Sequence, residues 1–252
     1  MENIIRPNRA ETTVYAYQKI IDNHLDPLLG AVPLSKLSPK QIQEYYQTMT
    51  RTEGLSSNTI RRHHDLLSAA LRMAVRQDML RVNPMERVEP PRPKLHEASY
   101  YTQENLKVLY QLVEGHWLEM VVKVTAGLGL RREEICGLKW ESVDFQRRVV
   151  HIKEARTAYG ATVVQKETKN RSSMRTLFMP DELYELLRRE KARQEQERAI
   201  RGGDYAASGH VVLDREGLPY SPNALSLAFT RFVRKNHLPR LTLHGLRHTF
   251  AT

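Results

Sequence analysis

A proline-rich stretch divides the chain into two regions. Residues 88–102 read VEPPRPKLHEASYYT, and the three prolines of this stretch cannot lie inside a helix. Such a composition is typical of an extended linker between folded domains. With 252 residues, the chain is long enough to form two hydrophobic cores. We therefore predict a first domain over residues 1–88, a linker over 89–101 and a second domain over 102–252.

The first region carries a helical pattern. Apolar residues recur at helical spacing between residues 14 and 24 and again between 56 and 80. Ser38 followed by Pro39 marks the start of a further helix, because serine caps a helix and proline is favoured in its first turn. We predict a small bundle of about four helices.

The second region mixes helices with short strands. Helical patterns cover residues 103–114 and 118–125, a long charged helix follows Pro180, and Ser221 with Pro222 begins another. Strand patterns occur in RRVVHI, ATVVQKET and MRTLFM, and we expect the last two to form a hairpin across KNRSS. The region is therefore predicted to be helical with a minor antiparallel sheet.

The charge of the chain indicates a polyanionic partner. Its net charge is +10, and no acidic residue follows Glu216 although five arginines and lysines do. The single cysteine, Cys136, excludes an internal disulfide and is typical of a reducing compartment. No apolar run reaches the length of a membrane span, and the first residues lack the apolar core of a signal peptide. The cytoplasm is the default location.

Three clusters of polar residues have spacings that favour chemistry. In HGLRHTFAT, His244 and Arg247 are three residues apart, so a helix places both on one face. Arginine binds phosphate oxygens with a planar fork, and histidine can transfer a proton near neutral pH. His248 lies four residues after His244, a spacing that zinc ligands also use, and ordinary surface histidines are a further interpretation.

The second cluster is TAGLGLRREEICGLKW. Gly127 and Gly129 indicate a tight break between two helices, after which Arg131 begins the next helix, where free backbone N–H groups favour phosphate. Glu134 either orients Arg131 or His248 or is a solvated residue of the first turn, and the second interpretation is slightly favoured.

The third cluster is ETKNRSSMRTLFMP. Lys169 is predicted at a hairpin tip, from which it can reach a leaving oxygen, although turns often carry lysines without a function. Together, two arginines, a histidine and a lysine on separate elements of a basic chain predict a metal-free phosphoryl-transfer site.

The three motifs, in this order and at these separations, resemble those of the tyrosine recombinases, specifically the phage and transposon integrases. The segments TTVYAYQKIIDNHLDPLLG and GLSSNTIRRHHDLLSAALRMAVRQ resemble their core-binding domain. The resemblance covers nearly the whole chain. It implies a mainly α fold with a small antiparallel sheet, in which a helical, SAM-like DNA-binding domain precedes an α+β catalytic domain.

The resemblance also implies roles for individual residues. Arg131 and Arg247 would hold the scissile phosphate, Lys169 would protonate the leaving 5′ oxygen, and His244 would assist proton transfer. No cofactor or metal is implied. The other expected residues are Glu134 and His248 in support, and Arg61, Arg62, Lys94, Arg171 and Arg175 as DNA contacts.

The nucleophile of this family is a tyrosine downstream of the HxLRH motif. All eleven tyrosines of the chain lie at or before Tyr220, and none matches that position. We therefore expect a fragment, incomplete at its C-terminus and without an N-terminal arm-binding domain, that binds DNA but cannot cleave it alone. The intact protein would be a DNA integrase working through a 3′-phosphotyrosyl intermediate. Glu133 stands where the family usually has a small residue.

The resemblance implies double-stranded DNA as the partner, a tetramer of the intact protein on that DNA, and accessory excision or host DNA-bending proteins. Bacterial or phage-encoded origin follows from it. Three alternatives stay open: a decayed recombinase that occupies sites as a regulator, a metal-dependent nuclease using His244 and His248, and a helix-turn-helix regulator.

Overall fold

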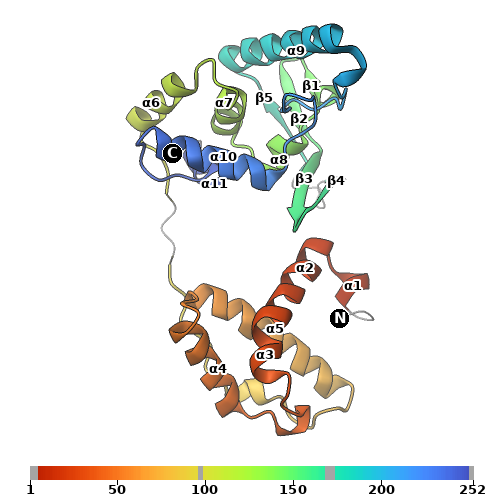
Figure 1. The fold of residues 1–252 in the computed structure, drawn as a ribbon, viewed down its shortest axis with the longest axis vertical. Coiled ribbons are helices and arrows are strands. Elements are labelled where there is room, and N and C mark those ends of the chain that lie inside the picture. The colour runs from red at the N-terminus through yellow and green to blue at the C-terminus, as the bar shows by residue number, and fades with distance from the viewer. Residues whose placement is uncertain (1–4, 96–98, 168–173, 250–252) are drawn as a thin grey trace. The chain divides into compact units, whose positions relative to one another are not determined.

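The computed structural model describes residues 5–95, 99–167 and 174–249. The chain falls into two compact units, residues 1–96 and 97–252, each with its own hydrophobic core (Figure 1). Among the described residues, no helix is long and apolar enough to cross a bilayer. The finer boundaries at residues 88 and 101 stay predictions.

The N-terminal unit is helical, as predicted. Its core forms where α4 packs against α5, and Ile42 and Ile60 are fully buried between them. Ser38 caps α4: its hydroxyl accepts from the backbone N–H of Gln41, whose side chain accepts in return from the Ser38 N–H. The helices are α1 (Ile5–Asn8), α2 (Glu11–Ile20), α3 (Asp26–Leu29), α4 (Pro39–Arg51) and α5 (Ser57–Arg76), with a π-helical turn at Ile21–Leu25 and 3-10 turns at Leu34–Lys36 and Pro84–Arg87.

Two histidines near the start of α5 face the core of this unit. His63 is 1% exposed, and its Nδ1 lies 2.7 Å from the hydroxyl of Tyr45. His64 makes the same kind of contact with Tyr46 at 3.0 Å. His63 is therefore a buried core residue, whereas His64 is half-buried. His63 lies three residues after Ile60, and this spacing places it on the buried face of the helix.

The chain after the N-terminal bundle is attached to the first turns of α5. The Asn58 side chain bonds both the N–H and the C=O of Lys94, at 3.1 and 2.9 Å. One Arg61 nitrogen donates to the Pro91 carbonyl at 3.1 Å. The proline-rich stretch thus packs on α5 as far as residue 94.

The C-terminal unit is built around α7, which contacts both α9 and α11 (Figure 1). Seven of its ten residues are buried. The helices predicted after Pro180 and Ser221 are present, and Leu225 and Phe229 of the second are fully buried. The helices are α6 (Gln103–Val113), α7 (Glu119–Leu128), α8 (Arg132–Gly137), α9 (Asp181–Arg201), α10 (Pro222–Lys235) and α11 (Leu243–Thr249), with 3-10 turns at Trp140–Ser142 and Gly202–Asp204.

Among the described residues of this unit, five short strands form two antiparallel sheets. One sheet has the order β1-β2-β5, with Val150 paired to Leu177, and the other pairs β3 with β4. The hairpin predicted between ATVVQKET and MRTLFM was wrong, because these segments, β4 and β5, pair with β3 and β2 instead. The strands are β1 (Val143–Asp144), β2 (Val149–Ile152), β3 (Glu154–Tyr159), β4 (Thr162–Glu167) and β5 (Arg175–Phe178).

Candidate active site

The site begins at the break between α7 and α8. Gly129 ends α7 in the left-handed conformation, with a φ of 59°, which glycine adopts without a steric penalty. Leu130 is then fully buried, and Arg131 directly precedes the first residue of α8. The Arg131 side chain remains 47% exposed. The buried side chain of Leu130 thus fixes the backbone before Arg131, while the Arg131 side chain remains half exposed to solvent.

Glu134, in the first turn of α8, is the centre of the site. It is only 2% exposed, so the interpretation as a solvated residue was wrong. Its carboxylate accepts from the backbone N–H and the guanidinium of Arg131, both at 2.8 Å, and from two nitrogens of Arg175 at 2.9 and 2.7 Å. Burial opposes the charged form, but these donors outweigh it and lower the pKa of Glu134 to about 2. Glu134 is therefore a buried, fully ionised carboxylate.

Arg247 reaches the same carboxylate from α11. Its Nη1 lies 3.7 Å from a Glu134 oxygen and donates to the Gly129 carbonyl at 2.8 Å. Close packing positions α11: a Cβ at Gly245 would lie 2.5 Å from the Ser99 carbonyl oxygen. Two arginines that are far apart in the sequence therefore meet at one point.

The two histidines of α11 lie beside the arginines. The rings of His244 and His248 are 4.7 Å apart between centroids and nearly perpendicular. Burial, and then the neighbouring His248 and Arg247, lower the pKa of His244, so its neutral form is favoured. No group of three or more possible metal-binding side chains occurs in the described ranges. The ion-pair partners of Glu134 are arginines, and within the described part of the chain no hydrogen bond or ion pair joins it to His248.

The other predicted residues fall into three groups. Arg175, the first residue of β5, pairs with Glu134 beside Arg131 and Arg247. Arg61, Arg62 and Lys94 belong to the N-terminal unit, where Arg62 and Lys94 are exposed and Arg61 is half-buried. Lys169 and Arg171 lie outside the described residues. We define the arginine cluster as Arg131, Arg175 and Arg247 around Glu134.

Sequence reasoning expected Arg175 as a DNA contact and predicted neither its bonds to Glu134 nor the bond from Arg247 to the Gly129 carbonyl. One available signal was the spacing of Glu134, three residues after Arg131 at a helix start. A glutamate at this position commonly accepts from the backbone N–H that precedes the helix. Nothing in the local sequence indicated that Arg175 would reach the same carboxylate.

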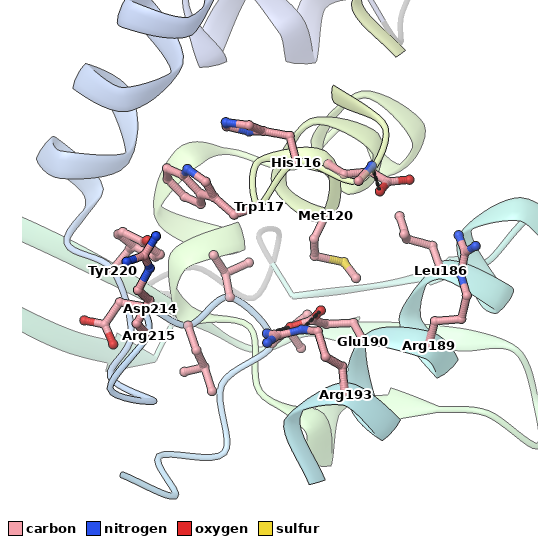
Figure 2. A pocket seen from close by; sticks show the side chains of 15 residues that line it. His116, Trp117, Met120, Leu186, Arg189, Glu190, Arg193, Asp214, Arg215 and Tyr220 are labelled. Atoms are coloured by element: carbon pink, nitrogen blue, oxygen red, sulfur yellow. Dashed lines mark hydrogen bonds and ion pairs between the residues drawn. The ribbon is translucent and has the colours of Figure 1, made fainter. Parts of the chain in front are cut away.

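A separate cavity of about 510 Å³ lies between the start of α7, α9 and residues 211–220 (Figure 2). Trp117 and Tyr220 stack along it with ring centroids 4.7 Å apart. Glu190 neutralises Arg193 there through two hydrogen bonds, and Arg189 lies nearby. None of the arginine cluster lines this cavity, so it is not part of the phosphate-binding candidate.

Comparisons with known proteins agree with this architecture. Residues 99–252 match the phage integrase family, and residues 1–50 match the N-terminal SAM-like domain of phage integrases. A tyrosine recombinase XerC-like protein of Caldanaerobacter subterraneus subsp. tengcongensis is 26% identical over 99% of this chain and 68% of its own length. The transposase of transposon Tn916 from Enterococcus faecalis is 24% identical over 100% of this chain and 64% of its own length.

Solved structures share the fold. The Tn1549 transposon integrase, solved in complex with transposon right end DNA, has a TM-score of 0.83 at 23% identity, over 97% of this chain and 81% of that chain. A lambda integrase tetramer bound to a Holliday junction has a TM-score of 0.69 at 18% identity, over 97% of this chain and 64% of that one. The present chain spans about two thirds of the length of the curated relatives it matches.

A helical SAM-like domain followed by an α+β domain is the architecture of a tyrosine-type recombinase. The predicted fold class and the predicted resemblance are both confirmed by these matches. The chain belongs to the phage integrase family, whose pattern covers more than half of it.

Proposed function

We propose that this chain acts in site-specific DNA recombination, with Arg131 and Arg247 binding the phosphate at which a strand is cut and rejoined. One observation carries this proposal: Arg131, directly before α8, and Arg247 of α11 converge beside one buried carboxylate. The carboxylate holds the guanidiniums close together despite their mutual repulsion. The site has a formal charge of +2, from three arginines and one glutamate, and this charge favours a phosphate diester.

The chemistry proposed for the site needs groups that hold charge and groups that move protons. A tyrosine hydroxyl attacks phosphorus, the bond from phosphorus to the 5′ oxygen breaks, and a 3′-phosphotyrosyl linkage forms. Arg131 and Arg247 stabilise the charge that develops on the phosphate oxygens, and loss of one such donor commonly reduces the rate by roughly a hundredfold to a thousandfold. We assign no tyrosine of residues 1–252 as the nucleophile.

The remaining proposed roles concern protons. Lys169 donates a proton to the leaving 5′ oxygen, and that hydroxyl later attacks the phosphotyrosyl bond to rejoin the strand. His244 donates a hydrogen bond to the phosphate or assists proton transfer, because it lies beside Arg247 on α11. His248 supports His244 through the contact between their rings.

We propose double-stranded DNA as the partner, contacted in the N-terminal unit by Arg61, Arg62 and Lys94 and in the C-terminal unit by Arg171. The net charge of +10 supports this. The solved relatives include integrases bound to DNA, one of them a tetramer on a Holliday junction, and we propose a tetramer for the present protein. Accessory excision or DNA-bending proteins, and a bacterial cytoplasmic location, belong to the same proposal. The similar proteins are a tyrosine recombinase and a transposase, which does not favour the alternative of a non-catalytic DNA-binding regulator.

The proposal is tested by neutralising phosphates one at a time. Duplexes that bind the chain are enriched from a random pool, and each phosphate of the shortest binding duplex is replaced by an uncharged methylphosphonate. At the phosphate held by the arginine pair, replacement should cost the wild type tenfold or more in affinity, since charge-assisted hydrogen bonds contribute about 1.5–3 kcal/mol each.

The matched variant is Arg247→Gln. It has already lost the contact, so the same replacement should cost it roughly twofold or less. Arg188→Gln removes an exposed arginine of α9 and should behave as the wild type. If every phosphate replacement costs Arg247→Gln as much as the wild type, Arg247 binds no phosphate and the proposal is wrong.

A further inference from the structure

Arg175 makes a two-point contact with the buried carboxylate. Its Nη1 and Nη2 donate to different oxygens of Glu134, at 2.9 and 2.7 Å. A bidentate pair of this kind has fixed geometry and is stronger than a bond between neutral groups. The Arg175 side chain is 26% exposed, whereas that of Arg131 is 47% exposed. Arg175 is thus directed inward, toward α8.

The four hydrogen bonds to Glu134 fill its acceptor sites. Oε1 accepts from Nη1 of Arg131 and Nη1 of Arg175, and Oε2 accepts from the Arg131 backbone N–H and from Nη2 of Arg175. A carboxylate offers about four lone-pair sites, two on each oxygen. Arg247 is therefore outside this set: it lies 3.7 Å from Oε2 and donates to the Gly129 carbonyl instead.

The titration behaviour of the arginines agrees with this difference. Hydrogen bonding to Glu134 raises the pKa of Arg175. Burial, followed by repulsion from Arg131, lowers the pKa of Arg247, with only a partial offset from Glu134. Glu134 thus stabilises the charge of Arg175 more than it stabilises the charge of Arg247.

We infer that Arg175 is a positioning residue: by filling the acceptor sites of Glu134, it keeps Arg247 from closing onto that carboxylate and leaves it available to a DNA phosphate. This role rests on the phosphate-binding function proposed for Arg131 and Arg247. It differs from a direct DNA contact by Arg175, which the sequence had led us to expect.

Removal of Arg175 would open two acceptor sites beside Arg247. The Arg247 guanidinium would then close from 3.7 Å to the roughly 2.8 Å of a charge-assisted hydrogen bond with Glu134. A donor engaged in this way competes poorly for phosphate. DNA affinity would fall although Arg175 itself never touches DNA.

A double-mutant cycle between Arg175→Gln and Glu134→Gln separates these two roles. Affinity for the enriched duplex is measured by fluorescence anisotropy over a range of salt concentrations. Arg175→Gln should weaken binding about tenfold in the wild-type background and less than twofold in the Glu134→Gln background, because no carboxylate is left to capture Arg247. Arg188→Gln is the control for loss of one exposed positive charge.

A direct phosphate contact by Arg175 gives a different pattern. The loss would be the same factor in both backgrounds, and the slope of log affinity against log salt would fall by about 0.9 in both. That result would overturn the inference, and so would unchanged affinity of Arg175→Gln in the wild-type background. Arg175→Lys keeps the charge but has a single nitrogen, and it provides the same comparison if the glutamine variant does not fold.

A DNA-free measurement keeps this inference distinct from the proposed function. The Nε–H NMR signal of Arg247, assigned with Arg247→Lys, should shift and exchange more slowly with water in Arg175→Gln. The double variant with Glu134→Gln should resemble the wild type. An unchanged Arg247 signal in Arg175→Gln refutes the positioning role, whereas failure of the wild-type chain to bind any duplex refutes the proposed function alone.

Discussion

Replacement of Glu134 by glutamine should strongly destabilise the C-terminal unit. The carboxylate is 2% exposed, and its pKa is lowered from 4.5 to about 2 by the arginines around it. At about 1.36 kcal/mol per pKa unit, this shift corresponds to roughly 3 kcal/mol of stabilisation of the charged form. Removal of one partner from a buried ion pair commonly costs about 3–5 kcal/mol, which agrees. We expect Glu134→Gln to lower the free energy of unfolding by about 3 kcal/mol.

The assay is urea unfolding followed by circular dichroism, with thermal unfolding alongside it. For a domain of this size, 3 kcal/mol lowers the melting temperature by roughly 6–12 °C. Glu133→Gln is the matched control, because Glu133 is the neighbouring residue, is 30% exposed and pairs with Arg132 on the surface. It should cost about 1 kcal/mol or less.

The pH dependence provides a second check. A depressed carboxyl pKa contributes stability above pH 4.5, and this contribution is lost as the pH falls toward 2. The difference between the wild type and Glu134→Gln should therefore be full at neutral pH and shrink below pH 4.5. A difference under 1 kcal/mol at pH 7, equal to that of Glu133→Gln, would show that the carboxylate does not hold the arginine cluster together.

Two further predictions concern packing and acid stability. Gly245→Ala should lower the free energy of unfolding by about 1–3 kcal/mol and weaken DNA binding, because the new Cβ would lie 2.5 Å from the Ser99 carbonyl oxygen. The control Gly203→Ala has open space around it and should change the stability little. Equal melting temperatures of the two variants would contradict this prediction. Burial lowers the pKa of His63 from 6.5 to about 4, because the folded protein disfavours a charged imidazole at this buried position. The contribution of His63 to the free energy of unfolding is therefore full above pH 6.5 and declines by about 3 kcal/mol as the pH falls to 4. Urea unfolding of the wild type and His63→Gln should show this slope only in the wild type.

Much of the secondary structure could be predicted from local patterns. Ser38, Ser56 and Ser221 each accept a backbone N–H at the start of a helix, and such caps can be identified from a few residues. The strands were harder to pair. β3 and β4 are joined by Gly160 and Ala161, a two-residue turn with Gly160 at a φ of 56°. Such a turn closes at a lower entropy cost than the longer connection between β4 and β5.

The sequence by itself determined the proline-rich division, the helices, the basic charge and three motifs that predicted a phosphate site. Only the tertiary structure decided which charged groups act together. Arg175 looked like a DNA contact and Glu134 like a solvated residue, yet they form the ion pair beside which Arg131 and Arg247 meet. Local spacing places a side chain on one face of its own element. Whether that face is buried, and which charge lies opposite, depends on elements far away in the chain.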